Sequence, residues 1–97
     1  MHSDPRYSLA QLRRACARVH AVIPPTPQQQ WPLLSAAAGA EVWVKHENHT
    51  PIGAFKVRGG INYVHKLCER EPATREVVAA STGNHGQSVV YAARRHG

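Results

Sequence analysis

The chain has 97 residues, 42% of them hydrophobic, and a formal net charge of +6 from 12 lysines and arginines against 6 acidic residues. These values fit one small folded domain and exclude a fully disordered chain, and no window holds the roughly 18 uncharged apolar residues that a membrane helix needs. Because the N-terminus also lacks the basic-then-apolar layout of a secretory signal, we expect a cytoplasmic protein with no membrane partner.

The basic residues and the cysteines are scattered along the chain. The densest basic groups, Arg13-Arg14 and Arg94-Arg95, fall where solvated helix faces are expected, so we predict no nucleic-acid partner. Cys16 and Cys68 lie far apart in helix-like segments, which favours two reduced thiols. The run His46-Glu47-Asn48-His49 is one residue too short for the zinc-binding helix motif, and we predict no metal site.

The first predicted element is a helix over residues 8–20, followed by a connector. Ser8 is a suitable N-cap, and apolar residues recur behind it at three- and four-residue steps. These residues are Leu9, Leu12, Cys16 and Val19. Residues 22–32 contain four of the seven prolines, which stop a helix and favour extended backbone.

A strand, a loop and a second helix come next. After a short helical or irregular piece over residues 33–38, residues 41–46 alternate between apolar and polar positions and predict a strand. Residues 47–53 are rich in turn-forming residues and predict a loop, and residues 54–70 predict a helix. The buried stripe of that helix contains Val57, Ile61, Val64 and Leu67. Gly59-Gly60 within it costs about 1 kcal/mol per glycine, which indicates close approach of another backbone or a ligand.

The same order then repeats. Residues 76–80 predict a short apolar strand, and after a polar loop residues 84–96 predict a helix. The inward residues of this helix are expected to be Val89, Val90 and Ala93. Such alternation is typical of parallel strands with crossover helices, so the predicted fold class is α/β with a partial open parallel sheet. We expect one incomplete α/β unit over residues 1–97, made of an N-terminal helix and Pro-rich connector and two strand–loop–helix segments. The three parts are 1–32, 33–75 and 76–97.

Both polar loops lie where open α/β sheets bind ligands, between the end of a strand and the start of a helix. In Ser81–Gln87, hydroxyls, an amide and helix N–H groups could hold an anion such as a carboxylate. Taken alone, a capped helix start without a ligand explains that loop equally well. Lys56 has apolar neighbours that would desolvate its amine and keep it nucleophilic, although a surface lysine is the simpler explanation of this residue by itself.

Together the two stretches resemble a known family. Phe55-Lys56-Val57-Arg58-Gly59, preceded by Lys45-His46-Glu47 and Pro51, is similar to the cofactor-lysine segment of the β-family (fold type II) of pyridoxal-phosphate enzymes, and most of all to threonine and serine dehydratases. The second signature of that family, Ser-x-Gly-Asn-His, is matched by Ser81-Thr82-Gly83-Asn84-His85, and Thr26-Pro27 is similar to its early connector. The resemblance spans nearly the whole chain.

The resemblance implies a role for each matching residue. Lys56 would form the Schiff base with pyridoxal 5'-phosphate, Phe55 would pack near the cofactor, and Asn84 would form a hydrogen bond with its ring hydroxyl. The pocket for the substrate carboxylate would contain Ser81, Thr82, Gly83 and His85. Ala54 stands where many members have serine. The glycine-rich phosphate loop of the family and the partner of the pyridine nitrogen are not found in this sequence, so we expect an N-terminal fragment.

The implied activity is that of a lyase. A threonine or serine dehydratase-like enzyme converts a β-hydroxy amino acid, its small-molecule partner, to a 2-oxo acid and ammonia. In that mechanism the freed Lys56 removes the Cα proton and the cofactor takes up the electrons. Two alternatives stay open, an amino-acid racemase of the same family and a truncated, non-catalytic fragment. We expect the full-length protein to be a homo-oligomer.

Overall fold

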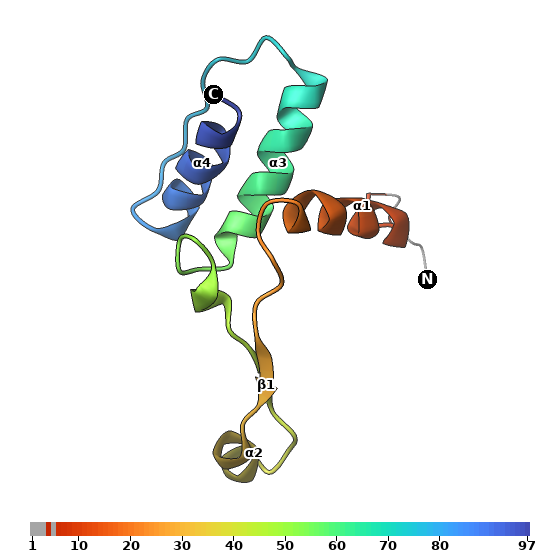
Figure 1. The fold of residues 1–97 in the computed structure, drawn as a ribbon, viewed down its shortest axis with the longest axis vertical. Coiled ribbons are helices and arrows are strands. Elements are labelled where there is room, and N and C mark those ends of the chain that lie inside the picture. Colours follow the sequence, from red (N-terminus) through yellow and green to blue (C-terminus); the bar gives the residue numbers. More distant parts are fainter. Residues whose placement is uncertain (1–3, 5) are drawn as a thin grey trace.

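The computed structural model describes residue 4 and residues 6–97, which form a body of helices with a projecting arm (Figure 1). The helices of the body are α1 (Leu9–His20), α3 (Lys56–Arg70) and α4 (Asn84–Arg95). The arm contains strand β1 (Gln28–Gln30), helix α2 (Pro32–Ala38) and strand β2 (Trp43–Lys45), and the short 3-10 helix η1 (Glu47–His49) leads from it towards α3. In this described part of the chain, no helix is both long and apolar enough to cross a membrane.

Helix α1 begins where the sequence predicts. Ser8 Oγ accepts the Gln11 N–H at 3.1 Å, and the Gln11 side chain accepts the Ser8 N–H at 3.4 Å, so the two residues form a capping box. The turn after the helix buries Ile23 against α3. The resulting core cluster contains Val19, Ile23, Val57 and Ile61. This small cluster fixes α1 on the first half of α3.

Helices α3 and α4 pack side by side (Figure 1) because a glycine leaves room at their contact. A Cβ on Gly60 would lie 2.0 Å from Ser88 Oγ and 3.0 Å from the Ser88 carbonyl oxygen. The prediction that this glycine pair marks close approach of another backbone is therefore confirmed at Gly60. Around Gly59, by contrast, a Cβ would meet no described atom within 4 Å.

The inward face of α4 differs in part from the prediction. Val89 and Ala93 are partly buried as expected, but Val90 is 53% exposed. The fully buried residues are Ser88 and Ala92, which lie one turn apart. Since the facing position on α3 is a glycine, the helices approach closely and small residues occupy the contact, which rotates the larger Val90 towards solvent.

The arm is a short antiparallel pair of strands that carries α2 at its tip. Gln28 of β1 lies opposite Lys45 of β2, and Gln30 lies opposite Trp43. Gly39 ends α2 with a φ of 65°, which glycine adopts without strain, and so the chain returns towards β2. The arm points away from the body (Figure 1), and the radius of gyration of 16.5 Å exceeds the roughly 12–13 Å of a compact domain of this length.

The strand pairing also differs from the prediction. Residues 76–80 run alongside α3 and α4 but pair with no strand in the described residues, and Val78 is 95% exposed. Within residues 4 and 6–97 the one paired ladder is antiparallel and includes β1, which lies in the segment that we expected to be a connector with extended backbone. A strand needs a partner at hydrogen-bonding distance, and the described residues place none beside residues 76–80. The α/β class agrees with the structure, whereas the pairing seen within these residues is antiparallel and not parallel.

Candidate functional site

Lys56 is the first residue of α3, and the turn before it is closed by Thr50. The Thr50 hydroxyl accepts the Ala54 N–H at 2.9 Å and donates to the Ala54 carbonyl oxygen at 2.7 Å. Thr50 itself is buried, with 8% of its surface exposed. Gly53 has a φ of 70°, a conformation that favours glycine. This turn determines where α3, and with it Lys56, begins.

Charged residues around Glu47 also stabilise the start of α3. The Arg58 guanidinium donates to both Glu47 carboxylate oxygens, at 2.7 and 3.1 Å. Thr26 of the connector donates its hydroxyl to Glu47 as well, and Lys45 Nζ lies 3.6 Å from Glu47 Oε1. The bonds from Arg58, with that from Thr26 and the nearby positive charges, lower the pKa of Glu47 to about 2 against the cost of its burial. Three segments that carry family signatures are thereby joined at one carboxylate.

Ser88 connects Lys56 to α4. Its hydroxyl donates to the main-chain carbonyl oxygen of Lys56 at 2.7 Å, and its side chain is fully buried. Because Gly60 lacks a Cβ, Ser88 can approach α3 closely enough for this bond. The contact places the N-terminal turns of α3 and α4 next to each other.

A cleft of about 500 Å³ opens between these two helices and residues 77–79. Its lining includes the amine of Lys56, the imidazole of His85 and the phenol ring of Tyr63. The remaining lining residues are small or apolar: Gly59, Gly60, Val64, Leu67, Val77, Val78, Ala79 and Val89. A primary amine and an imidazole therefore share a largely apolar cleft, a combination suited to holding an organic ring and moving a proton.

The environment of Lys56 differs from the prediction. Its side chain is exposed, and so is Phe55, of which 62% is accessible to solvent. Lys56 Nζ lies 5.8 Å from the centre of the Phe55 ring. Residues 4 and 6–97 do not enclose the amine, because Phe55 is itself exposed and Val57 is buried in the core cluster. Arg58, two residues after Lys56, is paired with Glu47.

The Ser81–Gln87 loop is folded around Ser81. Ser81 Oγ accepts the N–H of Gly83 at 3.2 Å and that of Gly86 at 3.1 Å. The residues around it are exposed at the start of α4, where the first N–H groups of a helix have no partner within it. Of the predicted carboxylate pocket, His85 lines the cleft with Lys56. Ser81, Thr82, Gly83 and Asn84 lie just before it and do not line the cleft.

Sequence reasoning missed the roles of three residues of this region. Tyr63 lies seven residues after Lys56, two helical turns along the same face, and this spacing could have identified it. Thr50 was expected only as one of the turn residues of the loop. Ser88 carried no comparable signal, because its hydroxyl bonds to a segment 32 residues away in the sequence.

Comparison with known proteins gives consistent results. The family described as "Pyridoxal-phosphate dependent enzyme" matches residues 19–97. The L-threonine dehydratase biosynthetic IlvA of Corynebacterium glutamicum is 40% identical over 88 residues, which cover 91% of this chain and 20% of that protein. Threonine dehydratase 1 biosynthetic, chloroplastic, of Solanum lycopersicum is 40% identical over 81 residues, 84% of this chain and 13% of that protein.

One solved structure extends the comparison. A pyridoxal 5'-phosphate-dependent aspartate racemase superposes with a TM-score of 0.86 and 31% sequence identity, over 98% of this chain and 30% of that one. The chain thus spans less than a third of the length of these relatives.

Proposed function

The chain belongs to the family of pyridoxal-phosphate dependent enzymes, and from that premise we propose that it contributes the lysine-bearing part of a dehydratase. The reaction proposed is the conversion of a β-hydroxy amino acid, threonine or serine, to a 2-oxo acid and ammonia. The observation that carries the proposal is the meeting of Lys56 and His85 at one cleft, since each comes from a different signature of the family. The threonine dehydratases similar to this chain support the choice of substrate class.

The residues at the cleft fit the cofactor that the family is named for. The cleft has room for a substituted pyridine ring, its walls are largely apolar, and a primary amine stands at its edge. In the proposal Lys56 binds pyridoxal 5'-phosphate, with Phe55 beside it and Asn84 as a polar contact. When bound, the cofactor supplies an electron sink for the carbanion that forms at the substrate Cα.

The residues of this chain then orient the substrate and move its proton. The Lys56 amine takes the proton from the substrate Cα, a role open to it because it is exposed at the cleft. The substrate carboxylate is held by Ser81, Thr82, Gly83 and His85, next to the N–H groups that open α4. Fixing the carboxylate there determines which substituent of Cα faces Lys56. The full-length protein is proposed to be cytoplasmic and homo-oligomeric.

One observation, the similarity to an aspartate racemase, supports amino-acid racemisation as a second candidate activity. A racemase would use the same proton abstraction and return the proton from the opposite face. Product analysis with L-threonine or L-serine separates the two: a dehydratase releases ammonia and a 2-oxo acid, and a racemase releases the other enantiomer.

The test of cofactor binding is the yellow colour that appears when pyridoxal 5'-phosphate bonds to a protein amine. We expect this colour with the unchanged chain and its loss in Lys56→Ala. Lys66→Ala, ten residues further along the same helix, is the matched control and should keep it. If both variants colour like the unchanged chain, Lys56 is not the cofactor lysine. Ammonia release is measured on the same samples.

A further inference from the structure

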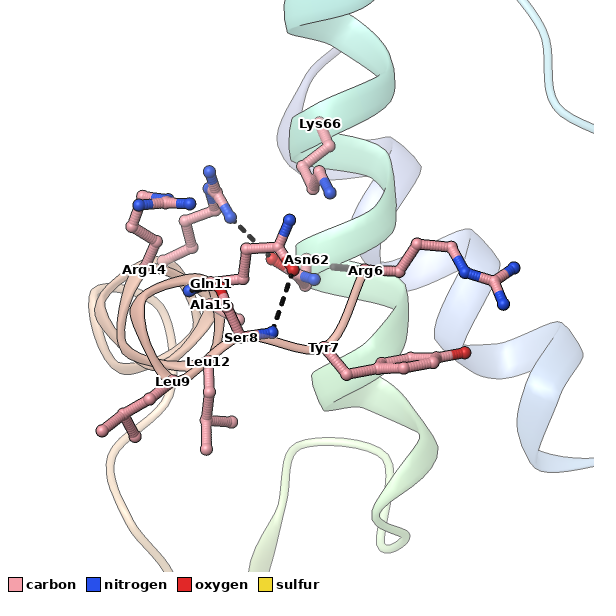
Figure 2. Close-up of a pocket in the computed structure, with 11 residues that line it drawn as sticks. Arg6, Tyr7, Ser8, Leu9, Gln11, Leu12, Arg14, Ala15, Asn62 and Lys66 are labelled. Atoms are coloured by element: carbon pink, nitrogen blue, oxygen red, sulfur yellow. Dashed lines mark hydrogen bonds between the residues drawn. The ribbon is translucent and has the colours of Figure 1, made fainter. Parts of the chain in front are cut away.

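A second cavity, of about 480 Å³, lies where α1 crosses α3 (Figure 2). It is lined by the segment before α1, by one face of α1, and by Asn62 and Lys66 of α3. It shares no lining residue with the cleft at Lys56. We call this cavity the basic pocket, after the charged residues that line it.

The basic pocket carries an unbalanced positive charge. Its charged lining residues are Arg6, Arg14, Arg18 and Lys66, and none of its lining residues is acidic. Arg6 forms an ion pair with Asp4, in which Arg6 Nη2 lies 2.6 Å from Asp4 Oδ2. For Arg14, Arg18 and Lys66, no carboxylate lies within 4 Å in the part of the chain that the structure describes. Like charges one turn apart, as in Arg14 and Arg18, destabilise a helix unless an anion compensates them.

The polar groups of the basic pocket are set up to donate hydrogen bonds. Arg18 Nη1 donates to Asn62 Oδ1 at 3.2 Å, across the contact between α1 and α3. With its oxygen so occupied, Asn62 offers its amide N–H groups to the pocket. Figure 2 shows Asn62 and Lys66 on successive turns of α3, with Arg14 on the side of α1. Ser8 and Gln11 already cap the start of α1. The attraction for an anion therefore comes from the basic side chains of the pocket and not from the end of the helix.

We propose that the basic pocket binds a small anion that carries a phosphate group. Arg14, Arg18 and Lys66 supply the charge, the guanidinium groups match phosphate oxygens in pairs, and Asn62 adds a neutral donor. Tyr7 and Leu12, both exposed, also line the pocket and offer apolar contacts to an organic substituent of a phosphate ester. The pocket is larger than a phosphate ion needs, and this favours an ester over the free ion.

The test is a titration of the isotope-labelled chain with inorganic phosphate and, separately, phenyl phosphate, at about 0.1 M salt, followed by amide NMR shifts. We expect saturable shifts at α1 and around Asn62, with tighter binding of the ester. Arg14→Gln and Lys66→Gln should each weaken binding by about three- to tenfold, since each removes a charged donor. Arg13→Gln removes the same charge from an exposed position outside the pocket and should leave affinity within about twofold.

Several outcomes would overturn the proposal. Shifts that stay linear, or equal weakening by Arg13→Gln, would mean that phosphate only screens a basic surface. Tighter binding of a short RNA, equally sensitive to Arg13→Gln, would assign the surface to nucleic acid instead. Lys56→Ala should leave phosphate binding unchanged, so the proposed enzymatic function and this site can fail independently of each other.

Discussion

Ser88 donates a hydrogen bond of 2.7 Å to the main-chain carbonyl oxygen of Lys56, from a position 32 residues further along the chain. The bond passes through the space left by Gly60, whose Cβ would collide with the Ser88 hydroxyl. Gly60, directly after the Phe55–Gly59 signature, thus makes room for Ser88, which follows the Ser81–His85 signature. Through this contact the candidate cofactor lysine and His85, in the first turn of α4, meet at one cleft.

The two adjacent glycines of α3 should respond in opposite ways to substitution by alanine. Gly60→Ala gains about 1 kcal/mol of helix propensity, but its Cβ forces the helices apart and costs about 1–3 kcal/mol. Gly59→Ala makes no such contact and should stabilise the chain by roughly 1 kcal/mol. Urea unfolding of both variants measures the difference. Equal stabilisation by the two alanines would contradict the close packing at Ser88.

Removal of the Ser88 hydroxyl should cost about as much stability as the Gly60 substitution. As a helical carbonyl, Lys56 C=O also accepts the N–H of residue 60, so it keeps one partner in Ser88→Ala. We expect a loss of about 1 kcal/mol in the free energy of unfolding, for one hydrogen bond and a small void. The measurement is again urea unfolding, with Ser35→Ala, whose hydroxyl accepts a bond within the arm, as the comparison. A loss above about 3 kcal/mol would mean that Lys56 C=O depends on Ser88 alone.

The helices could be predicted because each carries its signal within a few residues. The Ser8 cap and the apolar spacing of α1, and the stripe of Val57, Ile61 and Val64 on α3, are local patterns, and the structure places both helices as expected. The resemblance carried by Lys56 and the Ser81–His85 loop is local in the same way. That resemblance predicted the family, and the family match over residues 19–97 confirms it.

What the sequence could not show depends on distant partners. The pairing of β1 with β2 joins two segments of which one is three glutamines, with no alternation to mark a strand. The environment of Lys56 was misjudged because Val57, its apolar neighbour in the sequence, points to a different face of the helix and into the core. Glu47 was read as part of a motif, and its bonds to Thr26 and Arg58 appear only once three segments are folded together.

The turn closed by Thr50 gives a third prediction. Thr50→Val keeps the shape of the side chain but removes both bonds to Ala54, and we expect the free energy of unfolding to fall by about 1–3 kcal/mol. Hydrogen exchange at the Ala54 amide should accelerate more than exchange in the middle of α3. Thr50→Ser keeps the hydroxyl and should restore slow exchange at Ala54. If the Ala54 amide exchanges as fast in Thr50→Ser as in Thr50→Val, the hydroxyl of residue 50 does not stabilise the turn.

Glu47 makes stability depend on acid pH. Because folding lowers its pKa from 4.5 to about 2, the unfolded chain binds a proton more readily than the folded one. The stabilisation is therefore complete above about pH 4.5 and is lost as the pH falls towards 2. Allowing for partial solvent exposure of the carboxylate, we expect it to amount to roughly 2 kcal/mol.

The check is urea unfolding of Glu47→Gln between pH 2 and pH 6. Arg58 then loses its charged partner, so the variant should be less stable at pH 6 and approach the unchanged chain near pH 2. Glu76→Gln is the matched control, since Glu76 is exposed and forms no ion pair within the described residues. Its pH dependence should parallel that of the unchanged chain. A constant gap between Glu47→Gln and the unchanged chain across this range would show that the charge of Glu47 is not what stabilises the start of α3.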